Sequence, residues 1–211
     1  MEFGVGCRPL IIAMKGHPGT GKSKLAHAIA TTLRFPLIDK DDARDCTLPL
    51  TTSSSAKQLN DLSYQIIWRI AKTQLDLGLS VVIDSPLSRT AHLDHLKQIA
   101  APSGAHIVII ECMPHNEAKW RQRLEERGMN DAANWHKPAT WQDLEKLVEG
   151  YNGCYDYDVG DVPKLVIDTT AEVDVQELVS TVLRFIVTHA GSGSSQVDDL
   201  IFENMLPRVC T

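Results

Sequence analysis

Near the start of the chain, four residues have the types and the spacing of a phosphate-binding loop. They are Gly16, Gly21, Lys22 and Ser23, and they match the pattern G-x-x-x-x-G-K-[ST]. In this pattern the glycines let the backbone curl, so that successive N–H groups point toward phosphate oxygens. The lysine contacts the β- and γ-phosphates, and the final hydroxyl binds Mg²⁺. The spacing therefore predicts a site for a nucleoside triphosphate, with a ligand-free glycine-rich turn as the alternative.

The surroundings of this pattern favour the nucleotide interpretation, because an apolar run precedes it and a helical pattern follows it. A helix that begins at the loop directs the positive end of its dipole toward the phosphates. His17 occupies a variable position of the loop, and we assign it no chemistry. The residues expected to contact the nucleotide are Gly16, His17, Pro18, Gly19, Thr20, Gly21, Lys22, Ser23 and Lys24.

Carboxylates follow two further apolar runs. One run ends at Asp84, where a strand-end carboxylate can bind the Mg²⁺ shell directly or through water. The other ends in DKDDARD, residues 39–45, whose carboxylates repel one another unless cations or a hydroxyl lie among them. This placement suits a general base for a hydroxyl nucleophile. The alternatives are that Asp84 caps the next turn, and that residues 39–45 form a solvated helix start capped by Asp42.

Two arginines in NEAKWRQRLEERG, residues 116–128, lie four positions apart. Arg123 and Arg127 therefore share one helix face. Two guanidinium groups on one face can close over a triphosphate and balance the charge of the γ-phosphoryl group as it moves. The alternative is a surface helix with Arg123 paired to Glu126. Trp120 on this helix is expected to anchor it to the body of the protein rather than to contact a ligand.

Apolar runs alternate with helical patterns along the chain, as over residues 56–77 and 172–188. The apolar runs are continuous, which is typical of strands buried on both faces. Alternation of this kind predicts a parallel sheet with helices on both faces, which binds ligands at the carboxyl ends of its strands. Residues 47–55 and 128–138 are expected to be loops. The expected strands are residues 9–15, 35–39, 79–85, 105–113 and 164–170.

The composition fits a single globular domain, with 211 residues of which 43% are hydrophobic. Five cysteines without a CxxC pair suit a reducing compartment and argue against a disulfide framework or a zinc site. A net charge of -6 disfavours a nucleic-acid surface and favours a small-molecule partner. The chain has no apolar run of about 18 residues and no signal peptide, so we expect a cytoplasmic protein that does not bind membranes.

Taken together, these motifs resemble one group of P-loop kinases in the AAA-type P-loop NTPase superfamily. GHPGTGKS, DKDDAR, VVIDS, RQRLEERG and KLVIDT are similar to segments of the zeta-toxin, polynucleotide-kinase, gluconate-kinase and chloramphenicol-phosphotransferase group. The likeness covers about residues 9 to 188. It implies an α/β, three-layer P-loop NTPase fold with a five-stranded parallel sheet, helices on both faces and an arginine-bearing lid.

The same resemblance assigns roles to individual residues. It implies that Asp41 is the catalytic base, that Arg44 binds the acceptor, and that Arg123 and Arg127 belong to the lid. Lys24 departs from the group, which often has threonine there. The segment NWHKPATW matches no known acceptor signature, and the acceptors of the group range from sugars to nucleic-acid ends.

We therefore expect a phosphotransferase that uses ATP and Mg²⁺ and transfers the γ-phosphoryl group to a hydroxyl of a small molecule. Residues 1–190 would form the kinase domain, and residues 191–211 a flexible linker and a short helical tail suited to contact another subunit or domain. One alternative is a 5′-hydroxyl polynucleotide kinase, and another is a non-catalytic nucleotide-binding interaction module. Residues that could line part of a nucleic-acid channel are Arg44, Trp68, Arg69, Trp135 and Lys137.

Overall fold

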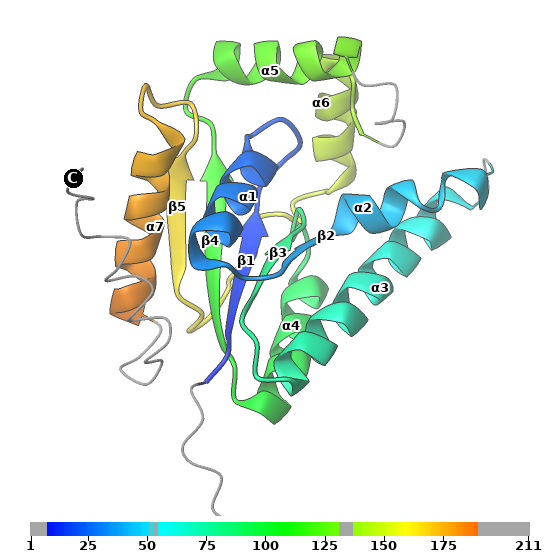
Figure 1. The fold of residues 1–211 in the computed structure, drawn as a ribbon. Coiled ribbons are helices and arrows are strands. Elements are labelled where there is room, and N and C mark those ends of the chain that lie inside the picture. Colours follow the sequence, from blue (N-terminus) through cyan, green and yellow to red (C-terminus); the bar gives the residue numbers. More distant parts are fainter. Residues whose placement is uncertain (1–7, 51, 53–54, 131–136, 190–211) are drawn as a thin grey trace, which may run out of the picture.

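The computed structural model describes residues 8–50, 52, 55–130 and 137–189 (Figure 1). The predicted linker and tail therefore lie outside the described residues. Within those ranges, no helix has both the length and the apolar character needed to cross a membrane.

Five parallel strands form one sheet in the order β2-β3-β1-β4-β5, which confirms the predicted fold class. Each strand lies within one of the expected apolar runs. The register aligns the strand ends, so that Asp39 at the end of β2 lies opposite Asp84 at the end of β3. The strands are β1 Leu10–Lys15, β2 Leu37–Asp39, β3 Val81–Asp84, β4 His106–Met113 and β5 Lys164–Asp168.

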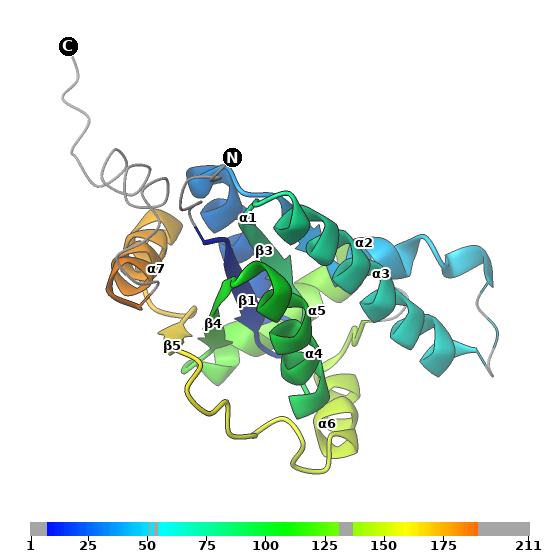
Figure 2. The ribbon, with the colours of Figure 1, turned by 90° about the horizontal axis from the view of Figure 1, so that it is seen from below.

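Helices cover both faces of the sheet, and strand β1 contributes to both cores. Its Ile12 and Met14 pack with α1 and α7, whereas Ile11 and Ala13 pack with α3 and α4. This two-sided burial explains the continuous apolar run, and Figure 2 shows the two helix layers on opposite sides of the sheet. The α-helices are α1 Lys22–Leu33, α2 Lys40–Asp45, α3 Ala56–Asp76, α4 Thr90–Ala100, α5 Glu117–Asn130, α6 Trp141–Gly150 and α7 Val175–His189.

Helix α5 lies beyond the carboxyl ends of the strands, above the loop between β1 and α1, and α6 lies to the right of that loop (Figure 1). The short helix α2 begins directly at the end of β2. This arrangement brings the loop, the strand-end aspartates and the two lid arginines to the same edge of the sheet, where the sequence predicted the ligand site.

Some local predictions need correction. Helix α5 continues to Asn130, so residues 128–130 belong to this helix and not to the loop expected at 128–138. A Cβ on Gly128 would lie 2.4 Å from the Ala139 carbonyl oxygen, so this glycine permits a close approach and does not end the helix. The loop expected at 47–55 contains the 3₁₀ turn Leu48–Leu50. Helix α2 is capped by Asp39, whose carboxylate accepts the Asp41 N–H, and not by Asp42.

Candidate active site

The loop between β1 and α1 has the backbone of a phosphate-binding turn. Gly19 and Gly21 have φ angles of 80° and 82°, a region that favours glycine. A Cβ on Gly19 would lie 3.1 Å from atoms of both Leu124 and Trp120. The Trp120 indole N–H also donates to the Pro18 carbonyl oxygen at 2.9 Å. Helix α5 is therefore anchored on the loop itself, which confirms the anchoring role predicted for Trp120.

Further contacts, within the loop and to other parts of the chain, stabilise its conformation. The Thr20 hydroxyl donates to the His17 carbonyl oxygen at 2.9 Å, and the Thr169 hydroxyl donates to the Thr20 carbonyl oxygen. The His17 ring stacks on Tyr155 with the ring centroids 3.8 Å apart. Burial, helped by the nearby Lys15 charge, lowers the pKa of His17 to about 4. His17 is therefore neutral near pH 7, and its ring packs against that of Tyr155.

Lys22, the first residue of α1, forms an ion pair with the Asp84 carboxylate. Burial disfavours the charge of this lysine, but Asp84 and the neighbouring aspartates outweigh that effect and raise the pKa of Lys22. Asp84 is only 1% exposed. One carboxylate oxygen contacts Lys22 and the other accepts no hydrogen bond from the described residues. Asp84 is therefore the counter-charge of the loop lysine and not a cap of the following turn, which was the alternative from the sequence.

The described residues at this strand edge fit a bound Mg²⁺ ion. The Asp84 Oδ2 atom is buried and has no hydrogen-bond partner among them, although its Oδ1 contacts Lys22. Within the described ranges no cluster of three or more metal-binding side chains occurs, and none is needed, because Mg²⁺ in kinases takes most of its ligands from phosphates and water. Ser23 and Asp84 thus offer the hard oxygen ligands that Mg²⁺ prefers.

Asp39 is a second strand-end carboxylate, which the sequence analysis included in the cluster 39–45 without giving it a role of its own. Burial, followed by the charge of the adjacent Asp84, raises the pKa of Asp39 to about 6. A cation bound between the ends of β2 and β3 would relieve this repulsion. Its position at the end of an apolar run was the sequence signal that could have identified it.

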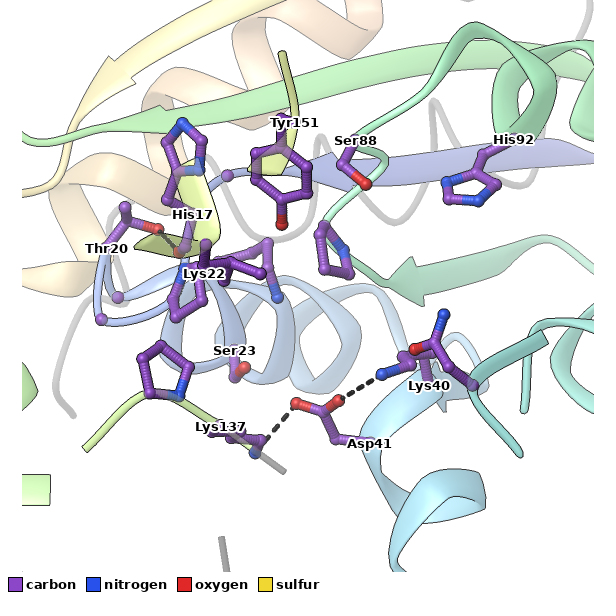
Figure 3. A pocket seen from close by; sticks show the side chains of 18 of the residues that line it. His17, Thr20, Lys22, Ser23, Lys40, Asp41, Ser88, His92, Lys137 and Tyr151 are labelled. Atoms are coloured by element: carbon purple, nitrogen blue, oxygen red, sulfur yellow. Dashed lines mark hydrogen bonds and ion pairs between the residues drawn. The ribbon is translucent and has the colours of Figure 1, made fainter. Parts of the chain in front are cut away.

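Asp41, the predicted base, lies at the start of α2 and faces two lysines. Its carboxylate is 3.3 Å from the Lys40 Nζ atom and 2.9 Å from the Lys137 Nζ atom (Figure 3). Both side chains of the second pair are about one-fifth exposed, so Asp41 remains accessible from the cavity. The repulsion expected within residues 39–45 is thus partly balanced by cations, as the sequence analysis required.

Arg44, the predicted acceptor-binding arginine, lies apart from these groups. It is 3% exposed, and its guanidinium group donates to the Thr47 hydroxyl at 2.6 Å and to the Ala56 carbonyl oxygen at 3.4 Å. Arg44 does not line the cavity described below. In this structure it joins α2 to the start of α3, and its role toward the acceptor stays a prediction.

The two lid arginines both reach the cavity. The Arg123 guanidinium group donates to the Thr169 carbonyl oxygen at 2.9 Å, and that of Arg127 to the Pro138 carbonyl oxygen at 3.0 Å. Arg123 lies beside the loop, since a Cβ on Gly21 would be 3.6 Å from its Nη1 atom. The alternative from the sequence, a surface pair between Arg123 and Glu126, is not formed, because Arg123 contacts the Thr169 backbone instead.

These groups meet in one cavity of about 670 Å³ (Figure 3). Its lining contains all the predicted loop residues, 16–24, together with Asp41, Arg123 and Arg127. The volume lies within the range of small-molecule sites, roughly 300–1,000 Å³. The structure therefore brings together the predicted nucleotide, base and lid residues.

The wall of the cavity opposite the loop was not anticipated. It includes Tyr64 of α3, Ser88 and Arg89 of the β3–α4 connection, and His92 of α4. It also includes Tyr151 just after α6, which reaches from this wall to the loop, where its ring centroid lies 5.8 Å from that of His17. Ser88 and Arg89 follow the third apolar run, and that position could have identified them. Tyr151 carries no signal in the sequence.

Of the proposed nucleic-acid channel residues that the structure describes, Trp68 stacks on His95 with the centroids 3.9 Å apart. Trp135 lies outside the described residues.

The fold and the loop define a P-loop NTPase. Residues 11–149 match the AAA domain family, and the chain belongs to this family. Among proteins of curated function, none matches the sequence.

Solved structures with this fold include several kinases. A protein of Chloroflexus aurantiacus J-10-fl described as a "putative kinase" matches with a TM-score of 0.69 and 23% identity, over 84% of this chain and 98% of that one. A gluconokinase of Sinorhizobium meliloti 1021 matches with a TM-score of 0.56 and 18% identity, over 93% and 98% of the two chains. The APS kinase CysC of Mycobacterium tuberculosis, solved with AMPPNP and APS, matches with a TM-score of 0.56 and 16% identity, over 86% and 99%. The resemblance to P-loop kinases is thus confirmed at the level of fold and family.

Proposed function

We propose that the protein is a kinase that transfers the γ-phosphoryl group of ATP to a hydroxyl group of a small molecule. The observation that carries this proposal is that one cavity contains both the loop, residues 16–24, and the accessible carboxylate of Asp41. The loop would hold the triphosphate, and Asp41 would face a hydroxyl that approaches from the opposite wall. Binding both substrates in one cavity supplies the positioning on which phosphoryl transfer depends.

In the proposed reaction, the acceptor oxygen forms a bond to the γ-phosphorus as the bond to the β-phosphate oxygen breaks. Asp41 accepts the hydroxyl proton, and ADP leaves. Lys22 turns from Asp84 to the β- and γ-phosphates, while Arg123 and Arg127 balance the charge that moves with the phosphoryl group. Ser23 and Asp84 would hold Mg²⁺, which when bound neutralises the phosphate oxygens.

Two further considerations support a small acceptor. The gluconokinase and the APS kinase with this fold are named for small-molecule substrates. Arg44 and Trp68, which a nucleic-acid channel would use, are engaged with the protein itself. A soluble metabolite is therefore the preferred partner.

The proposal is tested by a screen of metabolites and oligonucleotides for ATP-dependent gain of one phosphate, measured by mass spectrometry. Lys22→Ala is the control variant, with its fold checked by thermal melting, because Asp84 loses its counter-charge there. We expect transfer to a small hydroxyl compound by the wild type and none by Lys22→Ala. Nucleotide binding without any product would indicate an interaction module instead, and product only with oligonucleotides would indicate a polynucleotide kinase.

A further inference from the structure

The cavity wall opposite the loop contains a positive charge that the nucleotide machinery does not use. Arg89, in the connection from β3 to α4, is exposed and lines the cavity. Among the described residues it has no ion-pair partner. Burial raises the pKa of Tyr64 and Tyr151 and lowers that of His92, the Arg89 charge acts to lower the pKa of all three, and their rings line the same cavity. Arg89 therefore borders the same space as these rings.

The other charges near this wall do not neutralise the positive charge of Arg89. Lys40 and Lys137 are both paired with Asp41. Lys57 of α3 also lines the cavity and has no ion-pair partner among the described residues. Asp61 is the carboxylate on this wall, and its charge acts on His92 less strongly than that of Arg89. Two cations thus face one carboxylate, which leaves the wall positive although the whole chain carries a net charge of -6.

The rings around Arg89 are fixed in place. The His92 ring stacks on Tyr64 with the centroids 4.0 Å apart, and Tyr64 is only 5% exposed. The His92 Nδ1 atom is buried and has no hydrogen-bond partner among the described residues. Burial, then the Arg89 charge, lowers the pKa of His92 to about 4, so the ring is neutral near pH 7. A buried nitrogen without a hydrogen-bond partner costs free energy unless a ligand or a water molecule supplies that hydrogen bond.

We propose that the acceptor of this kinase is a small hydroxylated anion, whose carboxylate or phosphate group is bound by Arg89 while a neighbouring hydroxyl contacts His92. The inference rests on the proposed function and names its substrate class. An arginine suits either oxyanion, because its planar guanidinium group matches both in a bidentate geometry. Arg89 would thus select the acceptor and orient its reactive hydroxyl toward Asp41, without taking part in the transfer.

The test uses matched sets of compounds, each consisting of a neutral sugar or polyol, its carboxylate and its phosphate. Transfer from ATP is measured with the wild type, with Arg89→Gln, and with Arg69→Gln as control. Arg69 is also an exposed arginine, and it lies outside the cavity lining. We expect the wild type to prefer an anionic member, and comparison of the carboxylate with the phosphate identifies the group.

In Arg89→Gln we expect KM for the anion to rise about 10- to 100-fold, the effect of losing a charge-assisted hydrogen bond, with KM for ATP unchanged. KM for the neutral member should stay the same, so that the preference disappears. His92→Phe, which keeps the ring on Tyr64, should raise KM for the same acceptor about 3- to 10-fold. Arg69→Gln should behave as wild type.

Binding is measured separately by calorimetry with a non-hydrolysable ATP analogue present. If no anion exceeds its neutral counterpart in either turnover or binding, the inference is wrong. Equal losses for neutral and anionic compounds in Arg89→Gln would also overturn it, while Lys22-dependent transfer would leave the proposed function standing. Arg89-dependent binding of an anion without any transfer would support the anion subsite and contradict the kinase.

Discussion

The two ends of the cavity are built in opposite ways. At the loop end, several polar groups are already held by the protein: Trp120 donates to Pro18, Thr169 donates to Thr20, and Lys22 is paired with Asp84. At the opposite wall, Arg89 and Lys57 have no ion-pair partner among the described residues, and a nitrogen of His92 has no hydrogen-bond partner there.

This difference indicates which end is specific to this chain. A triphosphate has a fixed shape and charge, so a rigid loop with preset N–H groups suits it. At the opposite wall, Arg89, Lys57 and the His92 nitrogen remain open to a ligand, and these side chains decide which ligand that is. Changes at the loop end should therefore affect every reaction, whereas changes at the wall should affect the choice of acceptor.

The largest expected effect tests Asp41, at the boundary between the two ends. Asp41→Asn keeps the shape of the side chain and removes its basicity, so single-turnover transfer should fall by roughly 10² or more. Binding of ATP with Mg²⁺, measured by calorimetry, should stay within a few-fold of wild type. The exposed Asp42→Asn is the matched control. If Asp42→Asn were inactive and Asp41→Asn active, the base would be Asp42 and not Asp41.

Next in size are the lid arginines. Arg123→Ala and Arg127→Ala should each lower kcat by about tenfold or more, with a smaller effect on KM for ATP, because their charge is most needed during transfer. Arg121→Ala, on the same helix, is the control, since the Arg121 guanidinium group lies 4.8 Å from the centroid of the Trp141 ring and outside the cavity. Unchanged kcat in both lid variants would make these arginines structural.

A smaller effect is expected from Trp120→Phe, which removes the hydrogen bond to the Pro18 carbonyl oxygen while retaining an aromatic ring. KM for ATP should rise about 2- to 10-fold, and the preference among acceptors should not change. Steady-state kinetics with two different acceptors measures both quantities. A change in acceptor preference would show that the two ends are not independent.

The smallest effect concerns stability. The pKa of Asp39 is about 6 in the folded protein, above its usual value of 3.8. The folded state therefore binds the Asp39 proton more tightly, and stability is lost as the pH rises from about 4 to 6. Asp39→Asn should raise Tm at pH 7 by a few degrees, corresponding to roughly 1–2 kcal/mol, and by less at pH 4. Asp42→Asn should show no such pH-dependent gain in thermal melts, and a Tm equal to wild type at pH 7 for Asp39→Asn would contradict the assignment.

Much of the fold could be predicted from the sequence, because buried parallel strands require continuous apolar runs. All five strands lie within the runs identified, and α1 begins at Lys22, where the motif places a helix. The end of α5 was misjudged because Gly128 resembles a helix terminator. Its role is a close contact with Ala139, a residue eleven positions away, which no local pattern reveals.

The residues of the candidate site also differ in whether the sequence alone could identify them. The loop residues form one contiguous motif, so their spacing alone brings them together. The opposite wall combines Tyr64, Arg89, His92 and Tyr151 from separate elements, and only the fold places them around one space. For Arg44 the motif predicts an acceptor contact, which stays a prediction, and only the structure reveals that its guanidinium group donates to the Thr47 hydroxyl.

The ion pair between Lys22 and Asp84 has a thermodynamic consequence for how the nucleotide binds. When Lys22 turns to the phosphates, Asp84 keeps a buried negative charge without its former partner. A divalent cation that arrives with the nucleotide restores the balance, whereas free ATP does not. Nucleotide and metal should therefore bind with positive cooperativity, each raising the affinity of the protein for the other by the same factor.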